Sequence, residues 1–178
     1  YRAIQMMWFE WAGYRVGDPI LQTGITPDRG LVKRVKDLLL RTDYYPAFDL
    51  SEGDTVSLLK RLNGAGPIWF GGYASSLYVM AGMADAHGLR DVRFRGAISW
   101  GDKLFPHYRA KIKEVFGAES FDTYGSAEQI MVGAQHDLPY HYIMSPYVHL
   151  ELLDDNDQPV PDGEMGRVVV SRLYGYGM

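Results

Sequence analysis

The stretch that decides the fold runs from Gly96 to Glu128 and reads GAISWGDKLFPHYRAKIKEVFGAESFDTYGSAE. It has the order strand, glycine turn, helix, strand, glycine turn. Apolar or aromatic residues at steps of three and four predict its helix, which should end at Gly117, a typical C-terminal cap; they are Tyr108, Ile112, Val115 and Phe116. Two strands joined by a crossover helix form a βαβ unit with parallel strands. We therefore expect the turns 101–102 and 124–125 at one edge of a sheet, where ligands of open α/β sheets bind.

The residues expected at this edge have the chemistry to bind a nucleotide. Gly101 and Gly125 carry no Cβ, so backbone N–H groups can approach a ligand. Tyr124 offers a flat ring for a base, and Glu128 offers a carboxylate that could hold Mg²⁺. On spacing alone, the same residues also fit an ordinary turn, a half-buried strand end and an acid in the first turn of a helix.

Five segments resemble landmarks of the adenylate-forming enzymes, in the order that this superfamily has them. The run 124–128, Tyr-Gly-Ser-Ala-Glu, resembles their Tyr-Gly-x-Thr-Glu motif, and 101–104, Gly-Asp-Lys-Leu, resembles the Gly-Glu-x-Leu turn of phenylacetate-CoA ligases. Further similarities lie at residues 46–52, 72–77 and 161–170, particularly to the capsule-biosynthesis (CapK-type) members. The resemblance spans nearly the whole chain.

The resemblance implies an ATP-dependent, AMP-forming ligase that joins a small-molecule carboxylate to AMP and then passes the acyl group to a thiol, coenzyme A above all. It implies that Glu128 holds Mg²⁺ as the catalytic and metal-binding residue. It also implies two further sets of site residues. The nucleotide-binding set is Gly101, Asp102, Lys103, Tyr124, Gly125, Ser126 and Ala127, with Tyr124 stacked on adenine; the substrate-pocket set is Tyr73, Ala74 and Ser75.

The sequence departs from the pattern of this superfamily at two positions. Ala127 stands where the motif has Thr, whose hydroxyl reaches the α-phosphate, and Asp102 stands where the turn has Glu. A catalytically degenerate relative that serves binding or assembly in capsule or cell-envelope polysaccharide synthesis is therefore an alternative. An unrelated Rossmann domain has no support, because no Gly-x-Gly-x-x-Gly opens a helix.

Composition limits the classes of function. The chain has 178 residues, 47% hydrophobic and 22% charged, which is ordinary for a globular protein. Its net charge of −4, without a block of Lys or Arg, argues against a nucleic-acid partner. The lack of cysteine excludes disulfides and thiolate sites, and no apolar run approaches the roughly 18 to 20 residues of a membrane span. These features predict a cytoplasmic protein.

We expect an α/β fold with a mostly parallel sheet and flanking helices, followed by a small antiparallel β-rich subdomain. Residues 1–145 would be the nucleotide-binding part of the adenylate-forming large domain, and residues 146–178 the start of the β-rich subdomain. Both ends look like cuts in a longer chain. The phosphate loop, the ribose-binding Asp and the C-terminal domain with its catalytic Lys would lie outside it, so the fragment alone is predicted to be inactive.

Local patterns predict the remaining elements. The first segment, through Tyr14, should be a helix that ends in a loop with a turn at 17–19, and an amphipathic helix with a basic outer face should lie within 27–41. Ser51 should cap a helix over 52–62; a buried strand at 68–70 should lead into a helix over about 75–87, capped by Ser75 or Ser76. Strands at 148–153 and 167–173 should pair around the acidic turn 154–157.

Two metal sites are weaker alternatives. His136 and His141 lie five apart in a segment with Pro139 and without cysteine, which does not suit zinc. The acidic turn 154–157 lacks the spacing and distal Glu of a calcium-binding EF-hand.

Overall fold

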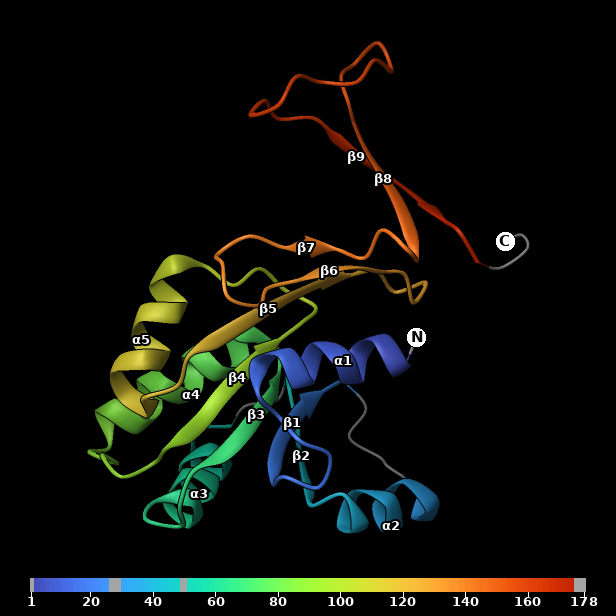
Figure 1. Cartoon of the computed structure of the whole chain (residues 1–178). Helices are drawn as coiled ribbons and strands as arrows, with labels where there is room; N and C mark the ends of the chain where they lie inside the picture. The colour runs from blue at the N-terminus through green and yellow to red at the C-terminus, as the bar shows by residue number, and fades with distance from the viewer. Residues whose placement is uncertain (1, 26–29, 49–50, 175–178) are drawn as a thin grey trace.

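The structure is a computed structural model that describes residues 2–25, 30–48 and 51–174 (Figure 1). Its helices are α1 (Arg2–Ala12), α2 (Leu31–Leu39), α3 (Glu52–Leu62), α4 (Ala74–Ala86) and α5 (Pro106–Phe116). Its strands are β1 (Ile20–Gly24), β2 (Thr42–Pro46), β3 (Ile68–Gly72), β4 (Phe94–Ser99), β5 (Ser120–Gly125), β6 (Met131–Ala134), β7 (Tyr142–Ile143), β8 (Val148–Leu153) and β9 (Arg167–Arg172).

The main sheet has the strand order β2-β1-β3-β4-β5-β6-β7. Strands β1 to β5 pair in parallel, whereas β6 and β7 extend the sheet in antiparallel fashion. Strands β8 and β9 form a separate antiparallel pair that projects from the β6–β7 side (Figure 1). The predicted fold class, a mostly parallel α/β sheet followed by a small antiparallel β unit, is confirmed.

Alternating side chains of the parallel strands build a core on each face of the sheet. Phe70 and Phe94 belong to the larger core, which α3, α4 and α5 cover. Trp69, next to Phe70, and Ile98, next to the core residue Ala97, point to the other face and pack with Phe9 of α1. Because successive side chains of a strand point to opposite faces, a strand that is apolar throughout must be covered on both sides. The helices lie accordingly in two layers (Figure 1).

Most local predictions are confirmed. Helix α5 ends at Gly117, which has φ +70°, and Ser51 Oγ accepts a hydrogen bond from the Asp54 N–H at the start of α3. Strands β8 and β9 pair in register from Val148 opposite Arg172 to Leu153 opposite Arg167, and residues 155–157 form a turn.

Four strands were not predicted, namely β1, β2, β6 and β7. Strand β2 ends at Pro46 on the outer edge of the sheet, where a missing N–H breaks no ladder bond. Strand β6 has four buried residues and no alternation, so its sequence carries no period-two pattern.

Helix α2 forms within the predicted range, whose residues 27–29 lie outside the described part. Its apolar side chains are exposed among the described residues, with Leu31 at 78%, Leu38 at 79% and Leu39 at 75%. The expected burial of one face is therefore not what the structure shows.

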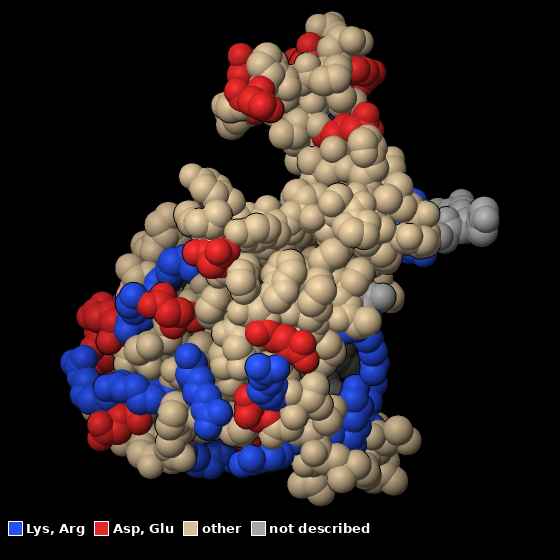
Figure 2. All heavy atoms as spheres, in the orientation of Figure 1, with Lys and Arg blue, Asp and Glu red and all other residues tan. Residues whose placement is uncertain are grey.

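Charges are mixed over the face drawn in Figure 2. Lys and Arg alternate with Asp and Glu over the helical part, and acidic side chains gather at the end of the β8–β9 hairpin (Figure 2). No helix of the described residues is both long and apolar enough to cross a membrane.

Candidate functional site

The two glycine turns lie at neighbouring strand ends, as predicted. Strands β4 and β5 run parallel, with Ala97, Ile98 and Ser99 opposite Ser120, Phe121 and Asp122. The chain leaves β4 at Trp100 and Gly101, and β5 ends at Gly125. Both turns therefore lie at the carboxyl edge of the sheet.

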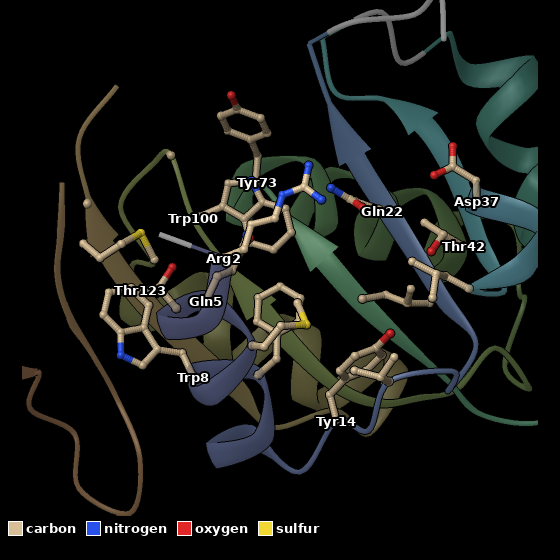
Figure 3. Close-up of a pocket in the computed structure, with 18 of the residues that line it drawn as sticks. Arg2, Gln5, Trp8, Tyr14, Gln22, Asp37, Thr42, Tyr73, Trp100 and Thr123 are labelled. Carbon is tan, nitrogen blue, oxygen red and sulfur yellow. The ribbon is translucent and has the colours of Figure 1, made fainter. Parts of the chain in front are cut away.

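A cavity of about 900 Å³ lies beside this edge, on the α1 side of the sheet (Figure 3). Five of the predicted site residues line it: Tyr73, Gly101, Gly125, Ser126 and Ala127. Ten of the other lining residues are aromatic or aliphatic, and seven are polar: Arg2, Gln5, Gln22, Lys36, Asp37, Thr42 and Thr123. An apolar hollow with a few polar groups is the usual form of a small-molecule site. The remaining predicted residues, Ala74, Ser75, Asp102, Lys103, Tyr124 and Glu128, lie outside its lining.

Two aromatic rings shape the end of the cavity near the strand tips. The Trp100 ring stacks on Phe9 of α1, with 5.8 Å between ring centroids and 17° between planes. It also fills the space over Gly71, where an added Cβ would lie 2.9 Å from the indole. The Tyr73 ring packs against Phe48 at 5.0 Å.

Gly101 is required at its position for two reasons. Its φ of +85° lies in the left-handed region, which residues with a Cβ rarely adopt. A Cβ there would also lie 2.6 Å from Cε1 of Tyr73. The turn after β4 and the ring at the start of α4 are thus in direct contact.

The side chain of Asp102 binds backbone N–H groups at the start of α4. One carboxylate oxygen accepts a hydrogen bond from the Ala74 N–H at 2.8 Å, and the other accepts one from the Ser75 N–H at 2.9 Å. The carboxylate therefore caps α4, and the prediction of Ser75 or Ser76 as the cap is wrong. The Ser76 hydroxyl instead donates to the carbonyl of Ala47.

The first two N–H groups of α4 and the N–H of Tyr73 already have partners within the protein. Asp102 occupies those of Ala74 and Ser75, while the Tyr73 N–H donates to Oγ1 of Thr23, which is fully buried. An anion at this helix end would have to displace a carboxylate that the chain already supplies.

Tyr124 lies on the opposite side of β5 from Thr123 and Gly125, the two residues that line the cavity. Its ring is 48% exposed and meets His141 edge-on, with centroids 6.3 Å apart. Beneath it, Asp122 accepts a hydrogen bond from the Ser99 hydroxyl at 2.8 Å, and its other oxygen lies 3.3 Å from Nε2 of His141. The contact to His141 falls short of hydrogen-bond geometry, because that buried nitrogen has no hydrogen-bond partner among the described residues.

Glu128 lies in an exposed turn between β5 and β6. The turn is closed by hydrogen bonds from the Ser126 N–H to the Ile130 carbonyl and from the Gln129 N–H to the Ser126 carbonyl. No helix begins there, so the alternative reading of Glu128 as a first-turn helix acid is wrong. A hydrogen bond from Ser126, aided by a backbone N–H, lowers the pKa of the Glu128 carboxyl.

Lys103 stands on the same turn as Asp102, with its ammonium 5.3 Å from the centre of the Phe105 ring. Within the described residues, no three His, Asp or Glu side chains are grouped so as to hold a metal ion by themselves. His136 lies beside Asp137 and His141 lies beside Asp122, so the two imidazoles face different acids. In the acidic turn, Oδ1 of Asp154 accepts hydrogen bonds from the N–H groups of Asn156 and Gln158.

Sequence reasoning did not assign Trp100, Thr123 or Gln22 to the site, although all three line the cavity. Trp100 directly precedes Gly101, and the neighbouring strand carries a glycine pair at 71–72, of which Gly71 leaves room for the indole ring. A large aromatic residue beside a glycine pair is a pattern that could have identified it.

No protein-family model matches the sequence, and no curated protein matches it. Solved structures do share its fold. A crystal structure of 2-hydroxyisobutyryl-CoA ligase in the postadenylation state, in complex with R3-HIB-AMP, superposes with a TM-score of 0.72 and 22% identity over 97% of this chain. An open conformation of the same ligase, in complex with 2-HIB-AMP and CoA, has a TM-score of 0.69 and 21% identity over 94% of this chain.

A third structure, apo MatB from Rhodopseudomonas palustris, has a TM-score of 0.59 and 16% identity over 96% of this chain. The chain spans 39%, 41% and 35% of the lengths of these three proteins. The chain therefore shares the fold of one part of 2-hydroxyisobutyryl-CoA ligase and of MatB.

Proposed function

We propose that this chain is part of an ATP-dependent, AMP-forming acid–CoA ligase that resembles the phenylacetate-CoA ligases. The observation that carries the proposal is the meeting of the two glycine turns, 101–103 and 124–128, at one edge of the sheet beside a largely apolar cavity. The fold shared with a ligase that was solved with R3-HIB-AMP supports it. Residues 1–145 would be the nucleotide-binding part and residues 146–178 the start of the β-rich subdomain.

The arrangement of the strand tips suggests where each substrate would bind. Adenine would stack on the exposed ring of Tyr124, outside the cavity, next to the backbone of the 101–103 turn. The acid would enter the cavity past Tyr73 and Trp100. The reacting carboxylate and the α-phosphate would then meet at the rim formed by Gly125, Ser126 and Ala127.

The chemistry needs positioned groups and no protein nucleophile. A carboxylate oxygen bonds to the α-phosphorus of ATP while the bond from that phosphorus to the bridging oxygen breaks, so that pyrophosphate leaves with the electron pair. The thiol of CoA then attacks the acyl carbon and AMP leaves. Charge repulsion and alignment limit the first step, so backbone donors at the rim and exclusion of water by the aromatic walls are this chain's contribution.

Glu128 suits the Mg²⁺ that accompanies ATP. Mg²⁺ in nucleotide sites is held by one or two carboxylates together with phosphate oxygens and water, and Glu128 is an exposed carboxylate that is ionised at neutral pH. Mg²⁺ bound there would neutralise phosphate charge. Ser126 would orient the carboxylate through its hydrogen bond.

Ala127 supports a second candidate function, a catalytically degenerate relative that binds a ligand or assembles with partners in capsule or cell-envelope polysaccharide synthesis. Ala127 lines the cavity without a hydroxyl, and the neighbouring hydroxyl of Ser126 is engaged with Glu128. The α-phosphate donor that the resemblance implies is thus missing from this pair of residues.

A pyrophosphate-release assay on the intact protein separates the two functions. With ATP, Mg²⁺ and a panel of aryl, acyl and hydroxy acids, the ligase should release pyrophosphate with at least one acid and then consume CoA. Release with no acid, despite ATP binding measured by calorimetry, would favour the degenerate relative. The chain on its own should release none.

A further inference from the structure

We propose that Asp102 is a positioning residue that couples the nucleotide side of the site to the acid side by fastening the turn after β4 to the first turn of α4. The inference rests on the proposed function for its kinetic consequences. Its structural basis is the double hydrogen bond from the N–H groups of Ala74 and Ser75 to the Asp102 carboxylate, at 2.8 and 2.9 Å.

The helix itself supplies no alternative cap. The first N–H groups of a helix have no partner within it, and the residue at the N-cap position of α4, Tyr73, makes no side-chain capping bond. Ser76, the nearest hydroxyl that is buried, is engaged with Ala47. Asp102 comes from a segment 27 and 28 residues away in sequence, so the cap also holds two loops together.

The fastening extends to a third strand tip. The Tyr73 N–H donates to Oγ1 of Thr23, at 3.2 Å, near the end of β1. Gly72 makes this contact sterically feasible, because a Cβ there would lie 1.9 Å from that oxygen. The backbone of residues 73–75 is thus fixed on one side by Thr23 and on the other by Asp102.

The consequence of this geometry is that Tyr73 and Gly101 cannot move independently. A Cβ on Gly101 would lie 2.6 Å from the Tyr73 ring. The next residue, Asp102, accepts a hydrogen bond from the N–H of Ala74, which follows Tyr73. If the 101–103 turn shifts when a nucleotide binds, the start of α4 and the ring of Tyr73 at the cavity shift with it. The Asp102 carboxylate, which is bonded to the first turn of α4, therefore acts through Tyr73 and Gly101.

The bonds can be tested without any activity. Hydrogen exchange on the intact protein should show slowly exchanging amides at Ala74 and Ser75, and Asp102→Ala should speed exchange at both. Asp102→Asn keeps one acceptor oxygen and should protect only one of the two. Asp155→Ala, an exposed carboxylate in the distal hairpin turn, is the matched control and should leave both amides protected.

The coupling is tested by kinetics on the same variants. Losing a helix cap of this kind costs about fivefold in the equilibrium that holds the loops together. Asp102→Ala should therefore raise the KM for the acid and the KM for ATP together, by about fivefold each, and added formate should reverse both by occupying the vacated cap. Asp102→Glu, which keeps a carboxylate, should show a smaller rise.

The results separate the inference from the proposed function. Faster exchange at Ala74 and Ser75 with unchanged KM values would overturn the coupling, and so would a rise in only one KM or a rise that formate does not reverse. If Asp102→Ala does not fold, Asp102→Asn and Asp102→Glu carry the same test. If the wild-type protein releases no pyrophosphate, the proposed function fails. The coupling can then be measured as the effect of added acid on the affinity for AMP, determined by calorimetry. If Asp102→Asn leaves that effect unchanged, the inference is overturned.

Discussion

Single residues at the strand tips are fixed by what lies next to them. Gly101 needs a positive φ and also a missing Cβ, whereas Gly71 and Gly96 need only the missing Cβ, because indole rings occupy that space. From the sequence, the missing Cβ of Gly101 was predicted to let backbone N–H groups approach a ligand. The structure adds that the Tyr73 ring takes up that space.

Replacing Gly101 by alanine should destabilise the protein. The left-handed backbone costs a residue with a Cβ about 1–2 kcal/mol, and the contact with Tyr73 adds to this cost. Gly82→Ala is the matched control, because Gly82 lies within α4 with open space around it and alanine favours a helix by about 0.5–1 kcal/mol. In denaturant unfolding, Gly101→Ala should have a lower free energy of unfolding than wild type, and Gly82→Ala a higher one. Equal stabilities would contradict this account.

The pKa of Glu128 should depend on Ser126. The hydrogen bond from Ser126 lowers the pKa of this carboxyl in the folded protein, so its stabilising effect is present above the pKa of the unfolded chain and is lost as the pH falls through the folded pKa. Ser126→Ala should raise the pKa of Glu128 toward its ordinary value. A carboxyl NMR titration measures it, and an unchanged midpoint would show that Ser126 does not orient Glu128.

Among the elements, helices were predicted better than strands, because a capped amphipathic helix carries its own start and stop residues. The predicted bounds of α3 are those observed, Glu52–Leu62. Strands β1 and β6 have no such marks. Strand β6 is buried against α1, which lies far away from it in sequence. The cap of α4 was missed for the same reason, since Asp102 is distant in sequence from the helix it caps.

The cap of α3 gives a stability prediction at this scale. Ser51 Oγ accepts from the Asp54 N–H and donates to the Asp54 carboxylate, so Ser51→Ala should lower the free energy of unfolding by about 1 kcal/mol. Ser57 is exposed in the middle of the same helix, with its hydroxyl bonded to the Gly53 carbonyl, and Ser57→Ala should be close to neutral. Thermal unfolding of both variants checks the pair, and a larger loss in Ser57→Ala would refute the assignment of the cap.

At the scale of the whole molecule, the parallel order of β3, β4 and β5 positions the site. It brings 72–75, 100–102 and 123–127 to one edge although they are distant in sequence. The βαβ pattern predicted this edge. It could not predict that Tyr124 lies outside the cavity while its neighbours line it, because that depends on the exact residue at which β5 aligns with β4.

The most direct test of the central claim is the affinity of the intact protein for AMP, measured by calorimetry for wild type, Tyr124→Ala and the control Tyr140→Ala. Stacking of a base on an aromatic ring contributes about 1–3 kcal/mol, so Tyr124→Ala should bind AMP about tenfold more weakly or worse. Tyr140 is 73% exposed and lies outside the strand-tip turns, so its loss should change nothing. If wild type binds no AMP, or Tyr124→Ala binds it as tightly as wild type, the strand tips are not the nucleotide site.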